Sequence, residues 1–165
     1  MKPSGIGGWL ILPAIGLVLT PILLLVTITR DLLPALQPEV WNALTEPGSQ
    51  AYHPMWSTVI LFEAVANVGF LVFTLWLGYL FVRQSSRTPA VFIVWLLINV
   101  AIQVIDLLLA QSIPVVAEES TAAVGREIFR AILQAAIWIP YFLRSERVRN
   151  TFTLGPQGAV APAES

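Results

Sequence analysis

The chain has 165 residues, of which 56% are hydrophobic and only 12% are charged, and its formal net charge is −1. Soluble domains carry about 25% charged residues, so this composition indicates a protein that folds in lipid, and the small net charge argues against a nucleic-acid-binding surface. The sequence has no cysteine, which excludes disulfides, thiolate metal sites and cysteine nucleophiles.

Four apolar segments are each long enough to cross a bilayer, because a hydrocarbon core about 30 Å thick needs about 20 helical residues. We place these spans at residues 6–28, 55–82, 89–112 and 122–143. No room remains for a separate globular domain. The sequence therefore predicts an all-α integral membrane protein, a four-helix transmembrane bundle formed by residues 1–150.

The first span contains Pro13 and Pro21 and is not followed by a signal-peptide cleavage site, so we expect it to be retained. Each proline removes one helical hydrogen bond. The span is then either a bent packing helix or a helix whose opened backbone lines a cavity within the protein.

The longest connector follows at residues 29–54, and two structures are compatible with its middle part. Residues 38–44 suit a short helix on the membrane surface, with proline at its first position, and an irregular loop is the equal alternative. Residues 151–165 are small and polar and contain proline, and we predict a disordered tail there.

Positive charges favour one side of the predicted bundle. They lie before the first span (Lys2), between the second and third spans (Arg83, Arg87) and after the fourth (Arg144, Arg147, Arg149). The opposite connectors carry mostly acids. The positive-inside rule then places both termini in the cytoplasm, and we expect the five arginines to contact anionic lipid headgroups.

Three charged side chains lie inside the predicted spans, namely Glu63, Asp106 and Arg130. The helical rise puts all three about 9–13 Å below the outer boundary of the membrane. Amide side chains follow them at steps of three and four, which places them on the same helix faces. The predicted buried polar cluster consists of Glu63, Asn67, Asn99, Gln103, Asp106, Arg130 and Gln134.

Two interpretations of this cluster stay open. Hydrogen bonds between the helices would fix their register, or the cluster would be a binding or proton site, since two carboxylates face one guanidinium. Enzymatic chemistry has no support, because the single histidine, His53, lies in a connector. We expect no catalytic residue, no metal ligand and no cofactor.

Several segments resemble an uncharacterised bacterial inner-membrane family with a four-helix domain of unknown function. They are the opening GIGGWLILPAIGLVLTP, the segment FEAVAN (Phe62–Asn67), Asp106, and AIWIPYFLRSERVRNTF (Ala136–Phe152). The resemblance implies a small multi-pass protein of the bacterial cytoplasmic membrane and implies no activity. It gives added weight to Glu63, Asn67 and Asp106 as one unit.

The leading hypothesis is a non-enzymatic accessory or assembly subunit that binds membrane-protein partners, a second copy of itself or lipid, and no nucleic acid. The alternative is a proton-coupled transporter or channel for a small solute. In that case Glu63 and Asp106 would carry protons, and Arg130 would hold them or an anionic substrate.

Overall fold

The computed structural model describes residues 4–154, and for residues 118–124 it describes the backbone alone. The elements in chain order are η1 (Gly8–Leu10), α1 (Ile11–Thr27), the π-helical turn η2 (Ile28–Leu32), α2 (Leu33–Ala35), α3 (Pro38–Thr45), α4 (Trp56–Val82), α5 (Thr88–Ala110), α6 (Pro114–Arg144) and α7 (Glu146–Thr151). Within the described range no strand forms beyond one isolated bridge. The predicted all-α class is confirmed.

Three helical segments of the described chain are long and apolar enough to cross a membrane: Gly8–Ala35, Trp56–Val82 and Thr88–Ala110. The first predicted span thus continues past residue 28, because the helix passes through a π-helical turn instead of ending. Large apolar side chains cover the outward faces of these helices, as lipid solvation requires, and Val65 is 74% exposed. The fourth predicted span corresponds to α6, which does not belong to this set because charged residues interrupt its first half.

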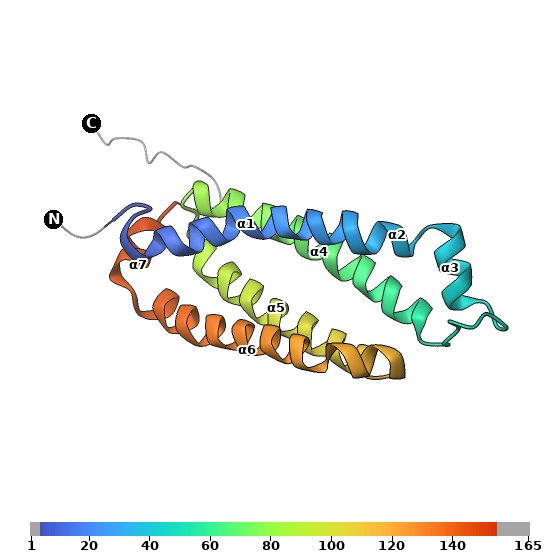
Figure 1. The fold of residues 1–165 in the computed structure, drawn as a ribbon. Helices are drawn as coiled ribbons and strands as arrows, with labels where there is room; N and C mark the ends of the chain where they lie inside the picture. The colour runs from blue at the N-terminus through green and yellow to red at the C-terminus, as the bar shows by residue number, and fades with distance from the viewer. Residues whose placement is uncertain (1–3, 155–165) are drawn as a thin grey trace, which may run out of the picture.

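Prolines mark the starts of the helices. Pro38, Pro89 and Pro114 lie in the first turns of α3, α5 and α6, where the missing N–H costs no hydrogen bond. Of the two alternatives for residues 38–44, the structure adopts the short helix. α3 lies across one end of the bundle, and α7 lies at the other (Figure 1); we call these the α3 end and the α7 end.

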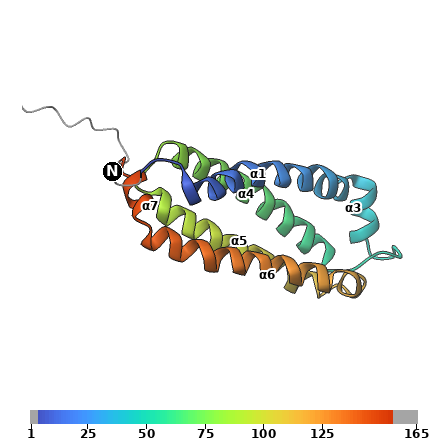
Figure 2. The same ribbon diagram turned by 60° about the vertical axis from the view of Figure 1, so that its left-hand side comes forward.

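The long helices form two antiparallel pairs. α1 packs along α4, α5 packs along α6, and contacts between α4 and α5 join the pairs. Figure 2, turned by 60°, shows the same arrangement, with α5 and α6 side by side along their length. The connection between the pairs therefore depends on how α4 meets α5.

Aromatic side chains fill the α7 half of the bundle. The rings of Phe92 and Phe142 stack with centroids 4.2 Å apart, and Phe152 packs edge-on against Phe81 at 5.1 Å. Thr151 and Phe152 are only 2% and 5% exposed. The predicted disordered tail is therefore wrong for residues 151–154, because Phe152 belongs to this aromatic core; residues 155–165 of that prediction lie outside the described residues.

The contact between α4 and α5 is fixed by a buried hydrogen bond. The Trp95 indole Nε1 donates to Thr74 Oγ1 at 2.9 Å, and the Thr74 hydroxyl donates to the Phe70 carbonyl at 2.7 Å. Phe70 and Trp95 also stack, with centroids 5.3 Å apart and an interplanar angle of 14°. One threonine thus ties the tryptophan of α5 to a single turn of α4.

We predict that Thr74→Val lowers the free energy of unfolding by about 1 kcal/mol, because the buried indole N–H loses its acceptor. Thr29→Val is the matched control. The Thr29 hydroxyl also donates to a carbonyl of its own helix, at Leu25, but it is exposed. Unfolding in mixed detergent micelles, followed by tryptophan fluorescence, measures both variants. Equal stability of the two would contradict the assigned role of the Thr74–Trp95 bond.

Candidate functional site

A cavity of about 500 Å³ lies between α1, α4, α5 and α6, in the half of the bundle toward the α3 end. Its wall is unusually polar for helices of this composition. The polar lining residues are Thr20, Thr27, Asp31, Glu63, Asn67, Asn99, Gln103, Asp106 and Glu127, and the apolar ones include Ala66 and Phe70. All four long helical segments contribute polar groups, so the helices turn their polar faces toward one space.

Helical spacing places five of the seven predicted residues on this wall. On α4, Asn67 follows Glu63 by one turn and donates from Nδ2 to the Glu63 carbonyl at 2.8 Å. On α5, Gln103 donates from Nε2 to Asn99 Oδ1 at 3.3 Å, and Asp106 continues the same face. The structure therefore brings together the predicted polar faces of the second and third spans.

Arg130 and Gln134 do not line the cavity. Arg130 is exposed, and no ion pair joins it to an acid within the part of the chain that the structure describes; Gln134 is half-buried in another position. The prediction of a Glu63–Asp106–Arg130 cluster is therefore wrong for the arginine. A long arginine side chain on an exposed position can keep its charged end out of the interior of the bundle.

Electrostatically the cavity is acidic. Every charged residue among its described lining residues is an acid: Asp31, Glu63, Asp106 or Glu127. Glu63 is close enough to Asp106 and Asp31 to be repelled by both, and Asp106 is repelled by Glu127. Repulsion between carboxylates is strong in a medium of low dielectric constant. The wall therefore favours cations or protons and disfavours anions.

The acids and the amides lie at different depths. At about 1.5 Å per helical residue, Asp106 lies roughly 27 Å along α5 from Thr88, whereas Asn99 lies roughly 16 Å along it. Glu63 is at a similar level on α4, roughly 28 Å from Val82. The cavity is thus rimmed by carboxylates near the α3 end and reaches amides near the middle of the bundle.

One polar atom of the wall lacks a partner. Gln103 Oε1 is buried and accepts no hydrogen bond within the described structure. A buried acceptor without a donor costs about 1–3 kcal/mol, and such groups are normally satisfied by water or a bound group. This atom marks a position where a hydrogen-bond donor would be stabilised.

Sequence reasoning missed Thr20, Thr27, Asp31 and Glu127. The first three follow one another at steps of seven and four, which is one helix face and was a readable signal. Asp31 lies in the π-helical turn η2, beyond the point where the first span was expected to end. Such turns are rare and frequently occur at functional sites.

The acids do not form a compact metal site. Among the side chains that the structure describes, no group of three or more His, Cys, Asp or Glu residues is placed to hold a metal ion.

The predicted lipid-contacting arginines gather at the α7 end, and four of them are exposed: Arg83, Arg87, Arg144 and Arg149. Arg83 lies over the ring of Tyr79, 5.7 Å from its centroid. Arg147 differs, because it is half-buried and its guanidinium donates to the Ser4 carbonyl at 3.5 Å. Arg147 therefore holds the N-terminal segment. The prediction of contacts with lipid headgroups is kept for the four exposed arginines.

These features define a small helical membrane protein with a polar cavity between its spans. Residues 3–153 match the model of a family described as "protein of unknown function (DUF2569)", and the chain belongs to that family. It is 32% identical over 154 residues to "Inner membrane protein YdgK" of Escherichia coli (strain K12), a match that covers 91% of this chain and 94% of that protein. No solved structure matches it. The chain is an inner-membrane protein, and the predicted family resemblance is confirmed.

We predict that a cysteine at Ala66, on the cavity wall, reacts with a water-soluble maleimide in isolated membranes. A cysteine at the neighbouring Val65 should react at least about tenfold more slowly, because that side chain faces outward into lipid. The native chain has no cysteine, so no background labelling interferes. Equal labelling at both positions would mean that the cavity is not filled with water.

Proposed function

We propose that this protein is a proton-coupled carrier for a small cationic solute. The observation that supports this function is the charge of the cavity wall, where acids from four helical segments face one space without a basic residue among the described lining residues. Ionisable groups at membrane depth are costly and are typical of substrate, ion and proton pathways. In a carrier, either a bound cation or bound protons can neutralise the negative charge of the same carboxylates. The cation and the protons therefore compete for one site.

Glu63 has the central role in this proposal. Its charge is opposed by that of Asp106 on α5 and that of Asp31 in η2, and all three residues line the cavity. Proton binding there relieves the repulsion, and so does a cation. Competition between the two at one carboxylate couples solute movement to proton movement.

The alternative of an accessory subunit draws less support from the geometry. A subunit that only binds partners needs an outward-facing contact surface, and an internal cavity with uncompensated acids adds nothing to such a surface. The acid-lined wall also argues against an anionic substrate, since Arg130 is not among the residues that line it.

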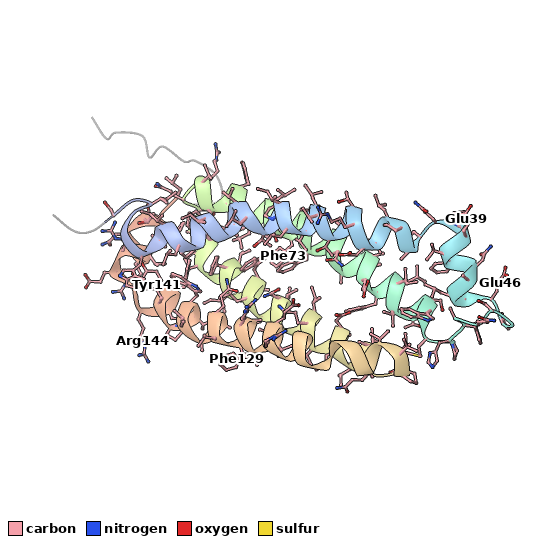
Figure 3. The ribbon with its side chains drawn as sticks, viewed as in Figure 1. Glu39, Glu46, Phe73, Phe129, Tyr141 and Arg144 are labelled. Atoms are coloured by element: carbon pink, nitrogen blue, oxygen red, sulfur yellow. The ribbon has the colours of Figure 1, made fainter. Side chains whose placement is uncertain are left out.

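The proposed topology has four spans with both termini in the cytoplasm. α6 has 31 residues, so it is roughly 46 Å long, and it packs along α5. Figure 3 shows Glu39 and Glu46 near α3 and Arg144 near the opposite end. Exposed arginines at the α7 end favour the cytoplasmic side for that end, and the acid rim of the cavity then lies toward the outer side.

Reporter fusions test this topology. We predict that a green fluorescent protein fused after residue 165 is fluorescent, and that alkaline phosphatase inserted after Ser49, between α3 and α4, is active. The reason is that four spans return the C-terminus to the cytoplasm, whereas three spans would leave it outside. Phosphatase activity from a C-terminal fusion would contradict the four-span proposal.

We predict that Glu63→Gln lowers cation-driven proton flux at least about tenfold, because the amide keeps the shape of the side chain but cannot bind and release a proton. Proteoliposomes containing a trapped pH-sensitive dye are exposed in turn to guanidinium, choline and tetraethylammonium. Glu39→Gln is the control, since Glu39 lies on α3 away from the cavity. Proton flux that is unchanged in Glu63→Gln, or absent from the native protein with all three cations, would contradict the carrier.

A further inference from the structure

The cavity has a distinct boundary toward the α7 end. Phe70 lines the cavity and is itself buried, and on its far side it stacks against Trp95 of α5. Trp95 is only 3% exposed. The polar space therefore ends at a pair of aromatic rings, one from each helix pair of the bundle.

Beyond this aromatic pair the buried side chains are mostly apolar. Trp95 contacts Phe92 with centroids 5.5 Å apart, and Phe92 stacks on Phe142. Leu77, two turns below Phe70 on α4, has no exposed surface. The lining of the polar cavity ends at Phe70. A separate pocket of about 440 Å³ on the α7 side, lined by Leu17, Thr74 and Phe81 among others, has an almost wholly apolar wall that disfavours ions.

A hydrogen bond holds the pair in place. Because Thr74 Oγ1 accepts from the Trp95 indole and donates to the Phe70 carbonyl, the orientation of the tryptophan is tied to the helical turn that carries Phe70. A shift of α4 along α5 would separate the stacked rings and break the bond between Trp95 and Thr74. Phe70 and Trp95 are therefore held together in this structure, and sliding of α4 along α5 would separate them.

We infer that Phe70 and Trp95 form the inner gate of the acid-lined cavity, with Thr74 as its latch. This inference rests on the proposed function, since a carrier needs a barrier on the side opposite to its open cavity. Access to the other side then requires the two helix pairs to move against each other at the contact between α4 and α5. The gate is closed in this structure.

Cysteine accessibility tests the gate without any transported solute. A single cysteine is placed in the cavity (Ala66→Cys) or below the gate (Leu77→Cys), and intact cells are treated with a membrane-impermeant maleimide. In the otherwise native chain we expect labelling of the first and none of the second. Adding Trp95→Ala should raise the labelling of Leu77→Cys at least about tenfold and leave that of Ala66→Cys unchanged.

Trp76→Ala is the matched control, because Trp76 is also a tryptophan of a predicted span but is 47% exposed on α4, whereas Trp95 is buried. It should leave Leu77→Cys unlabelled. Thr74→Val is the second opening variant and keeps both rings, so it tests the latch if Trp95→Ala fails to give a monodisperse protein. We expect Thr74→Val to raise the labelling of Leu77→Cys at least about threefold.

The outcomes separate this inference from the proposed function. Labelling of Leu77→Cys in the native background, or no increase in folded Trp95→Ala and Thr74→Val, would overturn the gate while leaving a cavity open to water. Failure to label Ala66→Cys in every background would instead remove the water-filled cavity, and with it the carrier.

Discussion

Carboxylates within membrane-spanning helices must avoid hydrocarbon, and this constraint determines how the helices of this protein are turned. Glu63 and Asp106 lie on helices whose other faces are covered with aliphatic side chains. If either carboxylate faced lipid, its burial in hydrocarbon would cost several kcal/mol of free energy. Facing each other across a cavity, they gain amide and hydroxyl neighbours at the cost of mutual repulsion. The rotation of α4 and α5 follows from that balance, and so does the existence of a polar space.

The aromatic packing at the α7 end makes the hollow half possible. A bundle with a 500 Å³ cavity has lost many van der Waals contacts in that half, and packing is the main force that holds membrane helices together. Stacked rings from α4, α5 and α6, with Phe152 folded back on them, compensate at the other end. The molecule thus divides into a mostly apolar half with stacked aromatic rings and a half with a polar cavity, with Phe70 and Trp95 at their junction.

The helical periodicity of the sequence predicted which polar residues share a face of α4 or α5, but it did not predict which residues contact each other across helices. Steps of three and four identified the polar faces of α4 and α5 from the sequence, because helical geometry is local. Asp31 was assigned to a connector because a charged pair normally ends a span, and only the π-helical turn keeps the chain helical there. The burial of Phe152 was likewise unpredictable, since its edge-on partner Phe81 is distant in sequence and its contact with Phe142 depends on the turn before α7. Contacts of this kind depend on tertiary packing rather than on any local pattern.

The difference between Arg130 and Glu127 decides what the cavity can do. The two residues lie one turn apart on α6, separated by roughly 60° around the helix axis. With Arg130 inside, two carboxylates and one guanidinium would form a nearly balanced network, which is typical of a contact that fixes helix register. Glu127, although exposed, lines the cavity and adds a further acid to a wall that has no base among its described residues. A wall of one sign leaves negative charge that a bound cation or protons would neutralise, and this difference between Glu127 and Arg130 is the basis of the proposed cation site.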